Sequence, residues 1–340
     1  MQKTRTRRCR ICGSEEEHAL YVAKETILGT FEKFSYFQCL DCGCLQISDI
    51  PANLADFYSQ DYHTNILEFE SRKTNAVSRF WREKATELLL SIPIGKGSPP
   101  PLFAKAFPGF LWRFKELGLN LHSRILDYGC GRGHFLFRLR EWGFRNLFGV
   151  DPFYHGQDMI EEGISLKKGD YTLLGESFDL IILNHVIEHL EEPLAILRTL
   201  KERLTPTGTI LVSTPIADSY GWRKFGNSWA MWDPPRHLHV FTAKAMALAA
   251  GRAGLQIAKV EYDAGKNLWA TSQFFALHPE QKTPISQEEL TRRQKPIRRW
   301  MRLLDEIGDS DMATFYLVLR PDNQNDVPGN SLSGFGDIDG

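Results

Sequence analysis

Three closely spaced glycines at the end of an apolar stretch constrain the fold of this chain most. Residues 125–133 read Ile-Leu-Asp-Tyr-Gly-Cys-Gly-Arg-Gly, so a stretch typical of a buried strand ends at Gly129, Gly131 and Gly133. Because glycine tolerates positive φ, the spacing predicts a tight turn that leads into a helix starting near His134. The unpaired N–H groups of such a helix start attract carboxylates or hydroxyls. We therefore expect a ligand at this turn.

An acid stands at the tip of the next predicted strand. Residues 147–151 read Leu-Phe-Gly-Val-Asp and end about 20 residues beyond the turn, where an acid can bind both hydroxyls of a ribose. The glycine pattern is D-x-G-x-G-x-G rather than the G-x-G-x-x-G of dinucleotide sites, with Asp127 two residues before the first glycine. A carboxylate there suits an ammonium group better than a pyrophosphate.

These residues resemble the glycine loop of the class I S-adenosylmethionine-dependent methyltransferases. The resemblance implies an α/β fold with a Rossmann-like, seven-stranded sheet. It also implies that the glycines contact the methionine end of the cofactor and that Asp151 holds its ribose. Asp170 stands where the family commonly contacts the adenine, although a solvated turn residue is the alternative, and Asn184 ends the apolar run 178–185 that should open on the site. The predicted cofactor-binding residues are Asp127, Gly129, Gly131, Gly133, Asp151, Asp170 and Asn184.

Composition indicates a globular protein with balanced charge. The chain has 340 residues, is 42% apolar and carries a formal net charge of −1, so no overall charge attracts nucleic acid or an anionic membrane. No apolar run reaches the length of a membrane span, and the first ten residues lack the apolar region of a signal sequence. We therefore expect a cytoplasmic protein whose cysteines are thiols or metal ligands.

Four cysteines form the second strong motif. They stand in two C-x-x-C-G knuckles, Cys9 with Cys12 and Cys39 with Cys42, and four thiolates fit a tetrahedral zinc ion. The sequence predicts a closed structural zinc ribbon, with buried or redox-active thiols as the alternative. Cys44 could replace Cys42, but the C-x-x-C spacing favours Cys42.

The motifs divide the chain into four parts. We expect a zinc ribbon at 1–50, a helical connector with a Gly/Pro linker at 51–105, the methyltransferase domain at 106–320 and a disordered tail at 321–340. Within the third part, the aromatic-rich segment at about 216–240 is expected to cap the substrate, with ordinary core packing as the alternative.

The candidate catalytic residues are His185, Glu188, His189 and His239. The first three lie at i, i+3 and i+4, which would put them on one helical face. In one interpretation a histidine is a general base. In another, these residues bind a second metal. The segment resembles the E-x-x-E-H motif of methyltransferases that modify the 3′ ends of small RNAs and of related ubiquinone-pathway enzymes, with His185 in place of the first glutamate. The RNA enzymes also have a further metal histidine at the position where His239 falls. In a third, His189 and His237 only brace the loop.

The whole chain resembles bacterial methyltransferases that pair a cysteine module with this catalytic domain and are similar to sugar C-methyltransferases and polysaccharide-cluster enzymes. The resemblance predicts methyl transfer to a hydroxylated small molecule, a sugar or glycan precursor, with no nucleic-acid partner. One alternative is an RNA methyltransferase that uses the zinc ribbon and the basic start, residues 3–10, to grip its substrate. Another is a binding protein that kept the fold without catalysis. The sequence leaves the acceptor atom and the oligomeric state open.

Overall fold

The computed structural model describes residues 3–4, 7–58, 75–93, 107–152, 154, 158–161, 163–169, 177–278 and 286–321. Asp170, the Gly/Pro linker at 95–101 and all but the first residue of the expected disordered tail lie outside the described residues. Of the expected connector, the structure describes the short 3₁₀ helix η1 (Leu54–Phe57) and helix α2 (Ala76–Ser91).

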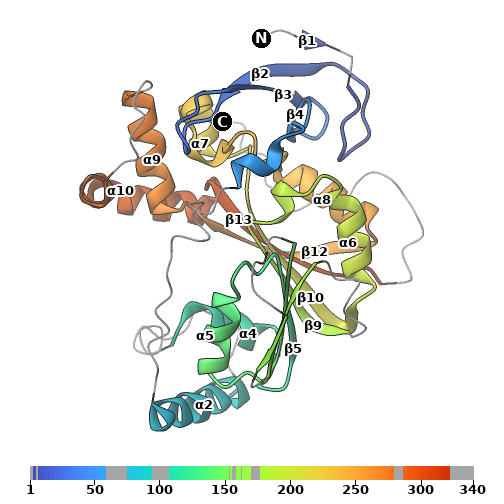
Figure 1. Ribbon diagram of the computed structural model, residues 1–340, viewed down its shortest axis with the longest axis vertical. Coiled ribbons are helices and arrows are strands. Elements are labelled where there is room, and N and C mark those ends of the chain that lie inside the picture. Colours follow the sequence, from blue (N-terminus) through green and yellow to red (C-terminus); the bar gives the residue numbers. More distant parts are fainter. Residues whose placement is uncertain are drawn as a thin grey trace.

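The core of the molecule is a mixed eight-stranded sheet (Figure 1). The strand order is β12-β13-β10-β9-β5-β6-β8-β7. The bounds are β5 Arg124–Tyr128, β6 Asn146–Asp151, β7 Met159–Glu161, β8 Ile164–Lys168, β9 Phe178–Asn184, β10 Leu204–Pro215, β12 Leu255–Asp263 and β13 Met312–Leu319. Strands β10, β9, β5, β6 and β8 are parallel, and β13 is antiparallel to both of its neighbours. The sheet has one strand more than predicted because β7 adds to the edge at β8.

Alternating side chains of the parallel strands enter two separate cores. Ile125 and Leu180 pack with α4 (Gly109–Glu116) and α5 (His134–Glu141), whereas Leu126 and Ile181 pack with α6 (Pro193–Lys201) and α8 (Ala243–Arg252). Successive residues of a strand point to opposite faces, so an uninterrupted apolar run fills both layers. Figure 1 shows these helix pairs on either side of the sheet.

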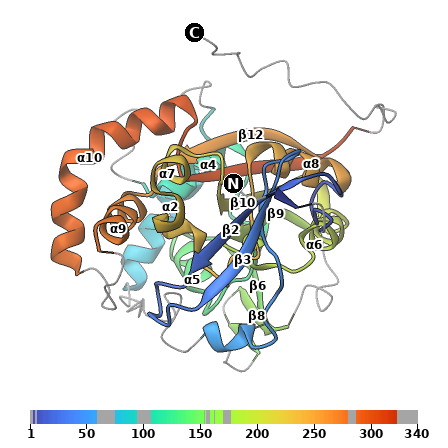
Figure 2. The same cartoon turned by 90° about the horizontal axis from the view of Figure 1, so that it is seen from above.

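The cysteine-rich start of the chain belongs to a second sheet, which is completed by a strand from far along the sequence. The order is β1-β2-β3-β4-β11. The bounds are β1 Lys3–Thr4, β2 His18–Lys24, β3 Lys33–Cys39, β4 Leu45–Ile47 and β11 His239–Val240. In the antiparallel pair β4–β11, Leu45 lies opposite Val240 and Gln46 opposite His239. The cysteine-rich segment 1–50, here called the cysteine module, therefore shares its sheet with residues that follow the central strands, and Figure 2 shows β2 and β3 lying over the middle of the molecule.

The aromatic segment packs mainly as core rather than as an open cap. Its elements are α7 (Tyr220–Phe225) and the short helices η4 (Gly226–Ser228) and η5 (Ala230–Trp232). Trp222, Trp229 and Trp232 are buried in one cluster with residues of β2, β3 and β4. Tyr220 instead stacks on Trp269 of α9, with ring centroids 5.7 Å apart. The aromatic side chains thus join the cysteine module to the catalytic part.

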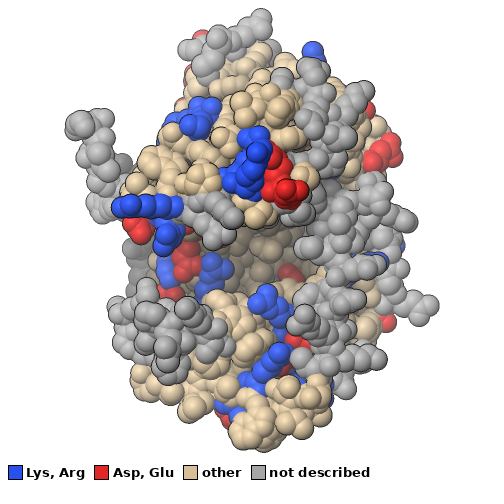
Figure 3. All heavy atoms as spheres, turned by 90° about the vertical axis from the view of Figure 1, so that its left-hand side faces the viewer, with Lys and Arg blue, Asp and Glu red and all other residues tan. Residues whose placement is uncertain are grey.

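Two C-terminal helices complete the structure, α9 (Lys266–Leu277) and α10 (Gln287–Ile307). A hollow crosses one face between the upper part, with the cysteine module, and the lower part, with α2 and α5, and Lys and Arg side chains lie on both of its borders (Figure 3). None of the described helices is long and apolar enough to cross a bilayer.

Candidate functional site

The glycine loop lies between β5 and α5 and has the backbone that the sequence predicts. Gly129, Gly131 and Gly133 have φ values of 77°, 54° and 74°. A Cβ at Gly129 would lie 2.4 Å from Cγ2 of Val186, and one at Gly133 would lie 2.8 Å from Cδ1 of Leu166. A Cβ at Gly131 would meet no described atom within 4 Å. The loop is therefore packed at its two ends and faces open space at its centre, as a ligand-binding turn requires.

Two carboxylates lie beside this loop. Asp151, at the end of β6, accepts a hydrogen bond from the Gly131 amide at 2.9 Å. Asp127 is buried at the end of β5, where burial and then the charge of Asp151 raise its pKa to about 7. An ammonium group nearby would favour both ionised forms. The loop and its acids thus suit a ligand that carries an ammonium group and ribose hydroxyls, as S-adenosylmethionine does.

The carboxyl end of β9 carries the exposed histidine of the site. Asn184 is exposed, and the next residue, His185, has φ of 56° and a side chain that is 44% exposed. Non-glycine residues rarely adopt this conformation, which is often found at functional sites. His185 Nδ1 lies 3.3 Å from Glu188 Oε1. Burial lowers the pKa of His185, but this carboxylate, together with Asp233, outweighs burial and raises the pKa above its usual value.

Glu188 is fully buried on the short 3₁₀ helix η3 (Ile187–His189). Its Oε2 accepts a hydrogen bond from Thr214 Oγ1 at 3.0 Å. Burial raises the pKa of Glu188, yet the hydrogen bond and charge of His185, followed by the charges of His189 and His237, lower it to about 2. The carboxylate is therefore ionised at neutral pH and faces three imidazoles.

Two of these imidazoles are oriented by backbone carbonyls. Nδ1 of His189 lies 3.0 Å from the Arg236 carbonyl, and Nδ1 of His237 lies 2.8 Å from the Met231 carbonyl. Since a carbonyl only accepts, each Nδ1 carries a proton, and Nε2 is the ring nitrogen left to contact Glu188 or a ligand. Ligand atoms of Glu188, His189 and His237 all lie within 4.8 Å of one another, so this trio could hold a divalent ion.

His239, which the sequence grouped with this site, lies elsewhere. It is fully buried on β11, and its Nε2 accepts a hydrogen bond from Arg10 Nε at 3.1 Å. Burial and then Arg10 lower the pKa of His239 to about 3. The structure places His237 beside Glu188 instead, with His237 Nε2 4.0 Å from Glu188 Oε1. His239 therefore does not contribute to the cluster predicted for it.

The position of His237 is fixed by residues that the sequence analysis did not single out. Asp233 has φ of 44°, and its two carboxylate oxygens form an ion pair with Arg236, Nε donating to Oδ2 at 3.0 Å. The fully buried Arg236 also donates from Nη1 to the Phe57 carbonyl at 3.1 Å. Tyr58 adds a contact of 3.0 Å between its hydroxyl and His189 Nδ1. The Asp-Pro-Pro-Arg motif at 233–236 was the sign of this ion pair in the sequence. The sequence alone does not show which residues these two side chains contact.

The four predicted zinc ligands lie together. Sγ atoms of Cys9 and Cys42 are 3.6 Å apart, those of Cys12 and Cys39 are 3.5 Å apart, and all four lie within 4.8 Å of one another. Sulfurs at about 2.3 Å from a tetrahedral zinc are separated by about 3.8 Å, so the cluster fits this ion. Cys44 is buried outside the cluster, with its Sγ directed to the Leu45 carbonyl.

The comparisons with known proteins agree with the loop and the sheet. Residues 101–260 match the family model described as a methyltransferase domain. The match covers just under half of the chain and makes residues 101–260 a methyltransferase domain. The predictions of the α/β fold and of a methyltransferase are thereby confirmed.

The curated relatives are named for the modification of tRNA. A tRNA U34 carboxymethyltransferase of Campylobacter hominis is 27% identical over 54% of this chain and 65% of its own length. The enzyme of the same name from Nautilia profundicola is 30% identical over 32% of this chain and 39% of its own length. The chain thus spans about two thirds or less of the relatives that it matches. A solved cyclopropane synthase, MmaA2 from Mycobacterium tuberculosis, aligns at 18% identity over 61% of this chain and 81% of its own, with a TM-score of 0.40.

Two of our expectations are corrected by these relatives. We expected a hydroxylated small molecule or glycan precursor as the acceptor, and we expected no nucleic-acid partner. Curated relatives named for tRNA contradict both predictions. Their names agree with the RNA alternative.

Asp151→Ala should weaken binding of S-adenosylmethionine by at least about tenfold. The change removes a charged acceptor for ribose hydroxyls, and hydrogen bonds to charged groups contribute about 1.5–3 kcal/mol each. Calorimetric titration at matched fold stability measures the effect, with Asp158→Ala on the neighbouring segment as the control. An affinity equal to that of the wild type would remove Asp151 from the cofactor site.

Purified protein should contain close to one zinc ion per chain, and Cys12→Ser should lower this content and the melting temperature. A structural site couples metal binding to folding, so loss of one thiolate weakens both. Elemental analysis of protein prepared without chelator checks the content. Cys44→Ala is the matched control and should retain the zinc, whereas wild-type protein free of zinc would contradict the site.

Proposed function

We propose that this protein is a S-adenosylmethionine-dependent transferase that modifies tRNA. The observation that carries the proposal is the match of its catalytic part to relatives named as tRNA U34 carboxymethyltransferases. The glycine loop and its two acids support cofactor binding independently of those names. An enzyme of this kind acts on tRNA in the cytoplasm, where reduced thiols can hold a structural zinc in the four-cysteine cluster.

The cofactor would lie against the glycine loop. When bound, S-adenosylmethionine supplies an electrophilic carbon on a sulfonium leaving group. We assign Gly129, Gly131 and Gly133 to the close approach of the backbone, Asp151 to the ribose and Asp127 to the ammonium group. Asn184, exposed at the end of β9, would lie at the junction of cofactor and acceptor.

The acceptor would meet His185 first. This side chain is half-exposed, whereas Glu188 behind it is buried, so His185 is the member of the cluster that can touch a substrate. We assign to His185 the removal of the acceptor proton at its exposed imidazole nitrogen, with Glu188 stabilising the imidazolium that results. His189 and His237 then act as positioning residues that keep Glu188 in place. The raised pKa of His185 predicts activity that increases with pH above the usual histidine range.

Incubation with S-adenosylmethionine and an unmodified tRNA transcript should attach one alkyl group to the RNA, detected by mass spectrometry of its nucleosides. S-adenosylmethionine carries a methyl group on its sulfonium, so the expected mass increase is that of one methyl group. His185→Ala should lower the rate by about 10²–10⁴, the usual contribution of a general base. His122→Ala is the matched control, because this exposed histidine lies near the opposite end of β5.

The same assay separates the alternatives. A wild-type enzyme that binds the cofactor but leaves tRNA unmodified would contradict the proposed substrate. Full activity in His185→Ala would show that the acceptor-side assignment is wrong. Loss of activity on chelation, with restoration by a divalent ion while the cysteine-bound zinc is retained, would instead assign Glu188, His189 and His237 to a metal.

A further inference from the structure

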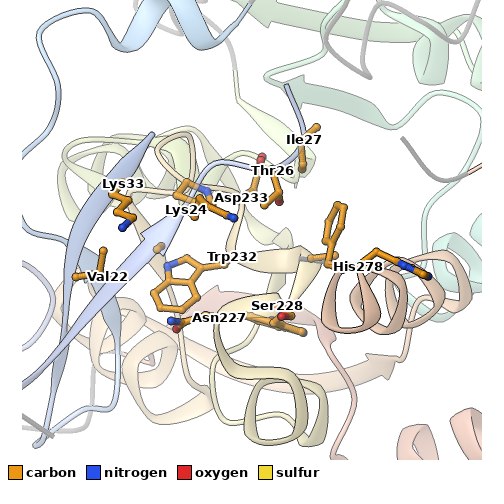
Figure 4. Close-up of a pocket in the computed structure, with 15 residues that line it drawn as sticks. Val22, Lys24, Thr26, Ile27, Lys33, Asn227, Ser228, Trp232, Asp233 and His278 are labelled. Atoms are coloured by element: carbon orange, nitrogen blue, oxygen red, sulfur yellow. The ribbon is translucent and has the colours of Figure 1, made fainter. Parts of the chain in front are cut away.

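A pocket lies where the cysteine module, the aromatic segment and α9 meet, and no role has been assigned to it above. It has a volume of about 360 Å³, within the size of small-ligand sites. Its walls come from the end of the β2–β3 hairpin, the segment 227–234 and the end of α9. Figure 4 shows Lys24 and Lys33 along one side of this hairpin pocket, with Trp232 in the middle and Asn227 and Ser228 on the other side.

Two lysines make the hairpin pocket basic. Lys24 and Lys33 lie directly opposite each other in the antiparallel pair β2–β3, and both line the pocket. An anion bound between them would be attracted by both ammonium groups. Among the described lining residues the one acid is Asp233, which is already paired with Arg236.

A buried donor in the wall of the pocket also lacks an acceptor. Trp232 is 1% exposed, and its Nε1 has no hydrogen-bond partner among the described residues. The indole is held in place by edge-on contacts with Tyr36 and Trp222, at centroid distances of 5.4 and 4.9 Å. Buried indole N–H groups normally find a partner, so a ligand oxygen that reached this atom would satisfy it.

The pocket adjoins the candidate catalytic cluster. Asp233 lines the pocket, and its Oδ2 lies 3.8 Å from Nε2 of His237. The ring of His237 in turn lies 4.7 Å from that of His189. A group bound in the pocket is therefore separated from the histidine cluster by the Asp233 side chain.

We propose that the hairpin pocket binds a phosphorylated nucleotide of the RNA substrate next to the nucleotide that is modified. Lys24 and Lys33 would hold its phosphate, the Trp232 indole would donate to one of its oxygens, and the Thr26, Asn227 and Ser228 side chains supply further polar groups. Val22, 52% exposed at the rim, leaves the pocket open, so a polynucleotide can enter and leave it. This inference rests on the proposed action on RNA.

Binding of a fluorescently labelled tRNA transcript tests the pocket, with S-adenosylhomocysteine present and salt varied. Lys33→Ala should weaken binding by about three- to tenfold and reduce the slope of log affinity against log salt by about one, because one phosphate contact is lost. Trp232→Phe keeps an aromatic ring and removes the N–H donor, and should weaken binding without changing that slope. The exposed Lys244→Ala on α8, on the other side of the molecule from α9, is the matched control and should bind as the wild type does.

The outcomes separate the pocket from the proposed function. If the wild type binds tRNA and the Lys33→Ala and Lys244→Ala variants bind it with equal affinity, the role of the pocket is overturned and tRNA remains the proposed substrate. Binding of uridine monophosphate but not of tRNA, lost in Lys33→Ala, would overturn the RNA source in favour of a free nucleotide. Binding of neither ligand by the wild type would overturn the pocket and the proposed function together.

Discussion

The β4–β11 pairing is the constraint on which the rest of this structure depends. It places Gln46, beside the cysteine cluster, opposite His239 of the catalytic part. Other bonds follow the same seam: Arg252 Nη1 donates to the Ile11 carbonyl at 2.8 Å, and Thr242 Oγ1 donates to the Cys42 carbonyl at 2.5 Å. The cysteines share one buried cluster with α6, α8 and one face of the central sheet. A metal bound at the cysteines would therefore act on the core that these elements share.

The candidate site is the direct product of this seam. Leu238, immediately before β11, donates its amide to the Glu188 carbonyl at 2.8 Å and accepts from the Ile47 amide at 3.0 Å. A single residue thus links the cysteine sheet to η3. Since η3 follows the end of β9, and Val186 lies against Gly129, the same link connects the histidine cluster to the glycine loop. The cysteine module would therefore help to position the residues that we assign to the acceptor.

The sequence predicted the parts of this protein that depend on local rules. The glycine turn, its two acids and the apolar strands follow from backbone conformation and from burial on both faces, which a short motif determines. The four cysteines follow from the geometry of metal ligation. By contrast, the choice of His237 over His239 depends on a two-residue strand whose partner lies almost 200 residues away, and no local pattern specifies it.

Two further differences have similar causes. The aromatic segment was expected as a cap or as core, and it became core because β2, β3 and β4 cover Trp222 and Trp232. The acceptor was predicted wrongly because the donor loop is shared by enzymes with many substrates, so it carries no information on the acceptor. Overall charge is also a poor guide to an RNA substrate, since basic groups can gather locally, as Lys24 and Lys33 do in the hairpin pocket.

Amide hydrogen exchange of wild type and Cys12→Ser tests most directly whether the cysteine module and the catalytic site are one cooperative unit. Loss of the cysteine cluster should release the β4–β11 pair and, through Leu238, the segment at η3. We predict faster exchange in peptides that span 186–190 and 237–242 as well as in 7–48. Acceleration confined to 7–48, with the other two segments unchanged, would contradict the account.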